Sequence, residues 1–201
     1  GDMDLLVDGG RSENTSKYLS SAMDSITGPL EYLFVTHPHY DHYPGATGVL
    51  GAKTVEHVIT NGETRGPPRD DEASASWDLF EAAVTDEGLT IETKSPGDVL
   101  DLGNGLTLTF LATGGLYPDT DSGTNINNDS LVMMLEYAGR KILLPGDIQD
   151  EAGEHLVDTW CTDMIENCTA LQADVFKVPH HGSSHFDDDF LSATQASWAV
   201  L

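Results

Sequence analysis

Three of the eight histidines, His37, His39 and His42, lie within six residues, directly after an apolar run that predicts a strand. A chain of this composition would contain the spacing H-x-H-x-D-H by chance in about one case in a thousand. On an extended loop His37 and His39 point to the same side, so they can share one metal ion. Asp41 and His42 offer an oxygen and a nitrogen to a second ion. A polar surface loop with incidental histidines is the weaker interpretation, because four ligand side chains converge after one strand.

Two further segments place possible ligands at the ends of predicted strands. The apolar run 143–145 leads through Gly146 to Asp147, which alone would more often cap a helix. The run 175–178 leads through Pro179 to His180 and His181, a pair that would be ambiguous alone. Together, three strand ends that carry His and Asp side chains predict one shared metal site.

The rest of the chain alternates predicted strands and helices, which indicates an α/β fold in a single domain spanning 1–201. We expect a helix over 12–26, a polar loop over 114–129 and mainly helix over 149–171. The first predicted strand has no strand before it, and the chain stops inside an apolar run. We therefore expect the domain to be truncated at both ends. The sequence contains no run of 18 apolar residues, so it predicts no membrane span in this segment.

Acidic residues outnumber basic ones by 34 to 9, which gives a net charge of −25. This self-repulsion opposes compaction at low salt, whereas at about 1 M salt the Debye length falls to about 3 Å. The composition is similar to that of proteins from halophiles that accumulate salt, and an ordinary acidic protein is the alternative. The charge argues against a nucleic-acid-binding face of the usual basic kind.

The two cysteines, Cys161 and Cys168, are seven residues apart in a segment that predicts helix. Seven helical residues rise about 10 Å, which is too far for a disulfide. We therefore expect two buried thiols. A disulfide would require the segment to be irregular, so the redox compartment stays open.

These motifs occur in a familiar order. With Asp8-Gly9-Gly10, the H-x-H-x-D-H segment, Gly146-Asp147 and His181-Gly182, the chain resembles the metallo-β-lactamase superfamily. Residues 6–10, 127–132, 144–147 and 180–183 are similar to the hydrolase domain of the ComEC DNA-uptake family. The resemblance covers about residues 4–201. It implies an αββα four-layer sandwich with the metal site at one edge.

The resemblance also implies roles for single residues. His37 and His39 would hold the first of two divalent ions, whereas Asp41, His42 and His181 would hold the second. Asp147 would bridge the ions, and Asp8 would support the first loop by hydrogen bonding. Asp41 and Asp147 would orient the attacking water. His180 matches the family less well than His181 as a ligand. From its proximity in sequence, and not from the resemblance, His180 is our candidate to donate a proton to the leaving group or to stabilise the oxyanion of the substrate, with His185 a weaker one.

One expected ligand is missing. Most members of the superfamily supply a third His to the first ion, but the only His between the first motif and Asp147 is His57, on an early strand. The loop 114–129 occupies the expected region and offers oxygen donors instead: Asp119, Asp121, Asn125, Asn128 and Asp129. A site with fewer nitrogens shifts the expected metal from zinc towards manganese, and both stay open.

Three functions follow as hypotheses. The first is a metal-dependent phosphodiesterase or nuclease acting on DNA. The second is a hydrolase of a thioester, lactone or β-lactam, a class that usually keeps the third His. The third is a non-catalytic metal-binding domain of a larger DNA-uptake membrane protein. The partner would be nucleic acid or a small phosphoester or ester. We expect no membrane contact in this segment, and a flanking domain could be embedded in the membrane. The location would be the cytoplasm of a salt-accumulating halophile or the outer face of its membrane.

Overall fold

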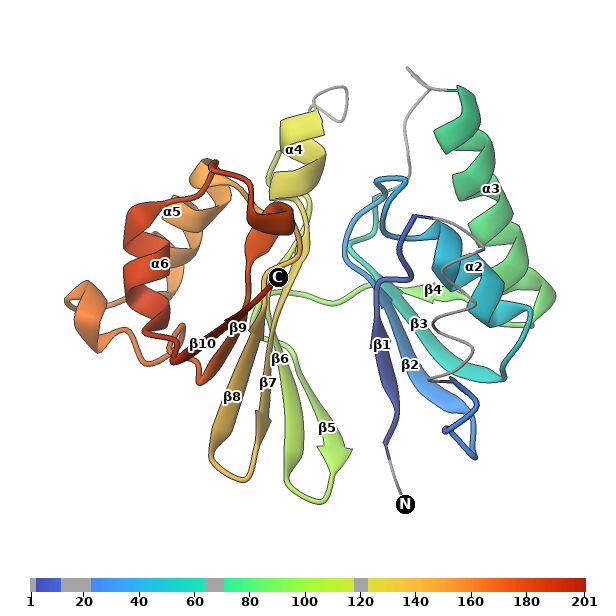
Figure 1. The fold of residues 1–201 in the computed structure, drawn as a ribbon, viewed down its shortest axis with the longest axis horizontal. Coiled ribbons are helices and arrows are strands. Elements are labelled where there is room, and N and C mark those ends of the chain that lie inside the picture. Colours follow the sequence, from blue (N-terminus) through green and yellow to red (C-terminus); the bar gives the residue numbers. More distant parts are fainter. Residues whose placement is uncertain (1–2, 12–22, 64–70, 118–122) are drawn as a thin grey trace. The chain divides into compact units, whose positions relative to one another are not determined.

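The computed structural model describes residues 3–11, 23–63, 71–117 and 123–201. They form two compact units: the first holds the described residues up to Thr93, and the second holds those from Lys94 onward. Each unit contains one β-sheet and its own helices (Figure 1).

The first unit is built on a four-stranded, all-parallel sheet with the order β1-β2-β3-β4. Its strands are β1 (Leu5–Val7), β2 (Leu30–Val35), β3 (Val55–Thr60) and β4 (Ile91–Glu92), and its described helices include α2 (Pro44–Leu50) and α3 (Asp71–Asp86). Trp77, Phe80 and Val84 recur every three or four residues, so they share one face of α3. They are buried against α2 and β2 in one apolar core.

The second unit is built on a six-stranded mixed sheet with the order β10-β9-β8-β7-β6-β5. Its strands are β5 (Val99–Gly103), β6 (Leu106–Thr113), β7 (Leu131–Tyr137), β8 (Arg140–Leu144), β9 (Val175–Lys177) and β10 (Trp198–Val200). Strands β5 to β8 pair antiparallel, whereas β8, β9 and β10 pair parallel.

The helices of the second unit follow the later strands. They are α4 (Gly123–Asn128), α5 (Asp150–Trp160) and α6 (Asp188–Thr194), with short 3-10 helices at Ile165–Asn167 and Pro179–Gly182. Helices α5 and α6 pack on the sheet through Leu156 and Phe190, and the Phe190 ring lies 6.1 Å from that of Phe176 on β9. The expected α/β architecture with two sheets and helices is confirmed.

Two expectations about local structure hold only in part. Residues 114–129 are not all loop, because α4 forms over 123–128 and buries Ile126, Asn127 and Asn128. The helix expected over 149–171 is interrupted, because α5 ends at Trp160, whose indole nitrogen donates to the Leu111 carbonyl at 3.0 Å, and only the short 3-10 helix at Ile165–Asn167 follows. The helix expected over 12–26 lies mostly outside the described residues. No helix in the described part of the chain has the length and apolar character needed to cross a bilayer. A single domain truncated at both ends stays a prediction.

Cys161 and Cys168 form a disulfide, which corrects the expectation of two thiols. Cys161 has an extended backbone at the end of α5, and the 3-10 helix at Ile165–Asn167 turns the chain back. The two Cα atoms therefore lie 4.8 Å apart instead of the distance that a continuous helix would impose. The irregularity that a disulfide requires is present.

The disulfide gives a first prediction. Alkylation of the unfolded protein should label no cysteine without reductant and both cysteines after reduction, as read by mass spectrometry. Closing so short a loop restricts the unfolded chain, so reduction should lower the free energy of unfolding by about 2–3 kcal/mol. If both cysteines were labelled without reductant, in protein purified under oxidising conditions, the result would contradict the disulfide.

Candidate metal centre

The first group of expected ligands follows the parallel strands β1 and β2 of the first unit. Parallel strands end at the same edge of a sheet, so the turn 8–10 and the loop 36–42 lie together. The amides of Gly9 and Gly10 donate to the His42 carbonyl at 2.6 and 3.1 Å. A Cβ atom on Gly9 would lie 2.0 Å from the Ala46 amide nitrogen. Glycine is therefore required where this turn meets α2.

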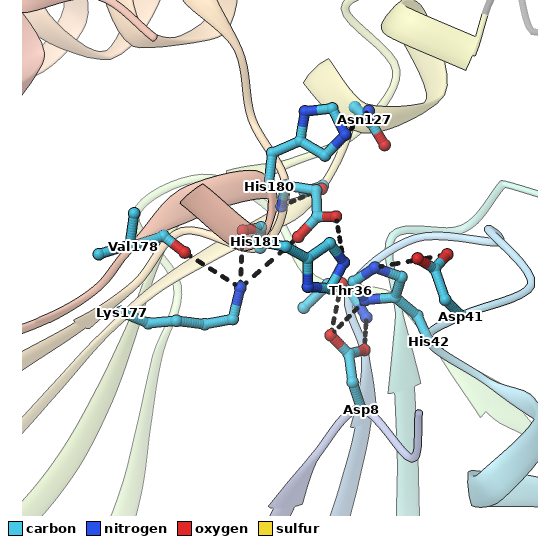
Figure 2. A network of polar contacts seen from close by, with 12 residues as sticks. Asp8, Thr36, Asp41, His42, Asn127, Lys177, Val178, His180 and His181 are labelled. Carbon is cyan, nitrogen blue, oxygen red and sulfur yellow. Dashed lines mark hydrogen bonds and ion pairs between the residues drawn. The ribbon is translucent and has the colours of Figure 1, made fainter. Parts of the chain in front are cut away.

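The carboxylate of Asp8 joins the turn to the loop by three hydrogen bonds (Figure 2). Its Oδ1 accepts from the Thr36 amide at 2.8 Å, and its Oδ2 accepts from Thr36 Oγ1 at 2.9 Å and from His42 Nδ1 at 2.8 Å. An ionised carboxylate only accepts, so every partner must donate. Asp8 thus supports the first loop as expected from the sequence.

These contacts determine which ring nitrogens carry hydrogen. His42 Nδ1 donates to Asp8, so His42 Nε2 presents its lone pair. Thr36 Oγ1 gives its hydrogen to Asp8, so at 3.0 Å it accepts from His37 Nδ1. His37 therefore also presents the lone pair of Nε2. Both imidazoles have the tautomer of a metal ligand whose second nitrogen is held by the protein.

The spacing of these donors fits a divalent cation. His37 Nε2 lies 3.0 Å from His39 Nδ1, and two nitrogens bound tetrahedrally to one zinc ion lie about 3.3 Å apart. The His42 ring centroid is 4.1 Å from that of His37. The half-exposed carboxylate of Asp41 has its Oδ1 3.9 Å from His42 Nε2. The first unit therefore brings together all four residues expected from H-x-H-x-D-H.

The second group of expected ligands follows the parallel strands β8 and β9 of the second unit. Asp147 comes after β8, and its amide donates to Ser130 Oγ at 3.1 Å. His181 comes after β9, and its Nε2 lies 3.1 Å from Asp147 Oδ2. An oxygen and a nitrogen at this distance again fit one divalent cation.

His180 and His181 lie on a tight turn with φ values of 46° and 51°. This left-handed conformation is uncommon for residues other than glycine and is concentrated at functional sites. It sends the two rings to different partners (Figure 2). His180 Nδ1 lies 3.1 Å from Gln149 Nε2, and its Nε2 lies 3.4 Å from Asn127 Nδ2. His181 contacts Asp147, in line with its better match to the family.

Asn128 and Asp129, which were considered as third ligands of the first ion, hold backbone of the second unit. Asn128 Oδ1 accepts from the Gln149 amide at 2.8 Å. Asp129 Oδ1 accepts from the amides of Leu116 and Tyr117 at 2.9 and 3.2 Å. Both side chains are buried. These contacts give the two residues structural tasks, and a role as third ligand of the first ion stays a prediction.

The structure also shows contacts of two of the other residues considered for that position, His57 and Asn125. His57 lies on β3, where its Nδ1 is 2.7 Å from Glu92 Oε1 and its ring stacks on Tyr32. The Asn125 carbonyl accepts from the Asp129 amide within α4 and its last turn. Asp119 and Asp121 lie outside the described residues. A third protein ligand of the first ion is thus not assigned.

Tyr117 lies beside the buried Asp129, to which its amide donates. Burial, with smaller contributions from the carboxylates of Glu151, Asp129 and Glu154, raises the pKa of its hydroxyl. Tyr117 therefore stays protonated near neutral pH and acts as a neutral hydrogen-bonding group, not as a base.

Sequence reasoning missed the partners that hold the ligands. Thr36 lies next to the histidine motif, and Ser130 lies next to Asn128 and Asp129, but nothing local shows that Ser130 bonds residue 147, which is 17 positions away. Gln149 and Lys177 were also missed. Their only local signal is that each lies within four residues of a proposed ligand.

Comparison with known proteins identifies the family of the chain. A model of the family described as the metallo-beta-lactamase superfamily matches residues 2–185. ComE operon protein 3 from Bacillus subtilis is 27% identical over 173 residues, which cover 86% of this chain and 20% of that protein. The chain thus spans about a fifth of the length of this relative.

Solved structures share the fold. A metallo-beta-lactamase from Pontibacter korlensis is 18% identical with a TM-score of 0.51, covering 94% of this chain and 80% of that one. The metallo-beta-lactamase FIM-1 from Pseudomonas aeruginosa, in a mono-zinc form, is 13% identical with a TM-score of 0.50, covering 97% and 78%. At these identities the likeness shows the fold alone.

The Asp8 contacts give a second prediction. Asn suits the left-handed backbone of residue 8 (φ 60°), so Asp8→Asn removes the carboxylate without adding backbone strain. It should lower the free energy of unfolding by about 1–3 kcal/mol and weaken divalent-metal binding about 10–100-fold, as measured by chemical denaturation and calorimetric titration. The exposed Asp24→Asn, in the same unit, should change neither. Native metal affinity in Asp8→Asn would refute the role of Asp8.

Proposed function

Because the chain belongs to the metallo-beta-lactamase superfamily, we propose that it is a metal-dependent phosphodiesterase or nuclease that works with two divalent cations. The observation that carries the proposal is the pair of ligand groups at the ends of parallel strands, each at a spacing that fits a divalent ion. Members of the superfamily are generally metal-dependent hydrolases, so the proposal concerns the reaction, the substrate and the number of ions.

The proposal combines both ligand groups around one pair of ions. In this proposal His37 and His39 would hold the first ion, Asp41, His42 and His181 would hold the second, and Asp147 would serve both. The donor chemistry fits, because neutral imidazoles and carboxylates are the usual ligands of zinc and manganese. With no third His at the first ion, the donor set is richer in oxygen, which favours manganese over zinc.

When bound, the ions supply charge stabilisation and lower the pKa of water. The residues of the chain position the reactants. The carboxylates of Asp41 and Asp147 accept hydrogen bonds from the attacking water and thereby orient it. His180 donates a proton to the leaving oxygen. Its Nε2 makes the longer contact, 3.4 Å to Asn127, so this nitrogen is the one that can turn to a substrate at the least cost.

DNA is the proposed substrate, and the support is the similarity to the B. subtilis ComE operon protein 3 together with the missing third His. The net charge of −25 opposes an approach of DNA at low salt. Molar salt screens this repulsion, and bound cations offset part of it. The proposal therefore includes a halophilic source and activity that rises with salt.

We place the domain at the outer face of the membrane, next to a membrane-embedded part of a longer protein. The Cys161–Cys168 disulfide supports this location over the cytoplasm, where thiols are kept reduced.

The test is cleavage of single-stranded DNA by manganese-loaded protein in about 2 M KCl, where the Debye length is only a few ångströms. Asp147→Ala removes the proposed bridging carboxylate and should lower the rate at least about 100-fold, which matches a loss of about 2.7 kcal/mol of transition-state stabilisation. Asp158→Ala, an exposed position on α5 of the same unit, is the matched control and should cleave like the native protein. Activity in 0.1 M KCl should be lower than in about 2 M KCl.

Two outcomes would contradict the proposal. Native protein that carries both ions but cleaves no DNA would exclude a nuclease and direct the search to thioesters, lactones and β-lactams. Native protein that binds metal but hydrolyses none of these would favour the non-catalytic metal-binding domain.

A further inference from the structure

Lys177 is the last residue of β9, and its ammonium group contacts three oxygens of the second unit (Figure 2). Its Nζ lies 3.2 Å from the Gly146 carbonyl, 3.5 Å from the Val178 carbonyl and 3.5 Å from Asp147 Oδ1. A lysine ammonium has three N–H donors and no acceptor. The contacts with the Gly146 and Val178 carbonyls are hydrogen bonds, and the contact with Asp147 is an ion pair.

The Gly146 carbonyl connects two loops. It accepts from Lys177 Nζ and also, at 3.4 Å, from the His180 amide. The loop after β8, which carries Asp147, is thereby tied to the turn after β9, which carries His181. That turn contains two non-glycine residues with positive φ, a conformation that persists only where neighbouring groups enforce it.

We propose that Lys177 is a positioning residue that holds the Asp147 carboxylate and the His180–His181 turn in place for a shared metal ion. The inference rests on the proposed function, because it takes Asp147 and His181 as ligands. Lys177 acts through these residues and touches neither the ion nor the substrate. It is one of only nine basic residues among 201, and two hydrogen bonds and an ion pair connect it to the loops that carry the ligands.

The positive charge of Lys177 has an effect on metal binding that opposes the effect of positioning the ligands. An ammonium 3.5 Å from a carboxylate competes with a cation for the same oxygen. If this competition dominated, removal of Lys177 would tighten metal binding. If positioning dominates, as we propose, removal weakens it, because partners that orient metal ligands are worth about 10–100-fold in affinity. The sign of the change therefore separates the two effects.

The experiment compares manganese binding to the native chain and to Lys177→Met by calorimetric titration, with the electron paramagnetic resonance spectrum of the loaded protein as a second readout. Lys177→Met should bind manganese about 10–100-fold more weakly and should change the spectrum of the ion held by Asp147. Lys177→Arg keeps the charge, but a planar guanidinium cannot reproduce three converging donors, so it should recover only part of the affinity.

Lys141→Met is the matched control. Lys141 also lies on a strand of the second unit, where its Nζ contacts the Thr169 carbonyl and Glu136. It should bind manganese like the native chain. Circular dichroism of the metal-free variants checks that each one folds. If Lys177→Met does not fold, Lys177→Arg decides: weaker binding than native supports the proposal, and native affinity overturns it.

Lys177→Met that folds and binds manganese as tightly as native, or more tightly, would overturn the inference. Asp147→Ala distinguishes this failure from failure of the proposed site. Weaker binding by Asp147→Ala with native binding by Lys177→Met would refute only the role of Lys177. Native binding by Asp147→Ala would refute the proposed metal site itself, and the inference with it.

Discussion

The geometry of the histidine loop depends on one carboxylate. Asp8 accepts from the amide and hydroxyl of Thr36 and from the ring of His42, and through Thr36 it also fixes the ring of His37. A partly buried carboxylate is stable here because three donors replace its water shell. The same bonds hold the rings of His37 and His42 through Nδ1, so the lone pair of each Nε2 points away from the residue that holds the ring. Thr36 and His42, which lie 28 and 34 positions from Asp8 in the sequence, are thus held in position without a metal ion.

The sequence predicts which proposed ligands lie near one another because two simple rules coincide. The proposed ligands follow predicted strands, and neighbouring parallel strands end at one edge of a sheet. Asp8 accordingly meets Thr36 and His42 after β1 and β2, and Asp147 meets His181 after β8 and β9. The left-handed turn also sends the rings of His180 and His181 to different partners. The family pattern favours His181 as the ligand.

The misses have a common cause, which is that tertiary contacts override local preference. Helix α4 forms in a polar segment because Ile126 is buried there, and α5 stops where the Trp160 indole is anchored to the Leu111 carbonyl. The contacts of Ser130 and Lys177 are also long-range, since their partners lie 17 and 31 residues away. No residue pattern within a short window encodes such pairs, so the support of the ligands had to be seen in the structure.

The Cys161–Cys168 bond has a consequence for how the chain matures. Two cysteines in one chain permit a single intramolecular pairing, whereas four would permit three. Within residues 1–201, oxidation of these two cysteines therefore has no scrambled intramolecular isomer to correct. The partners are also close in sequence, so the bond can close during early synthesis or export, before the sheet of the second unit is complete.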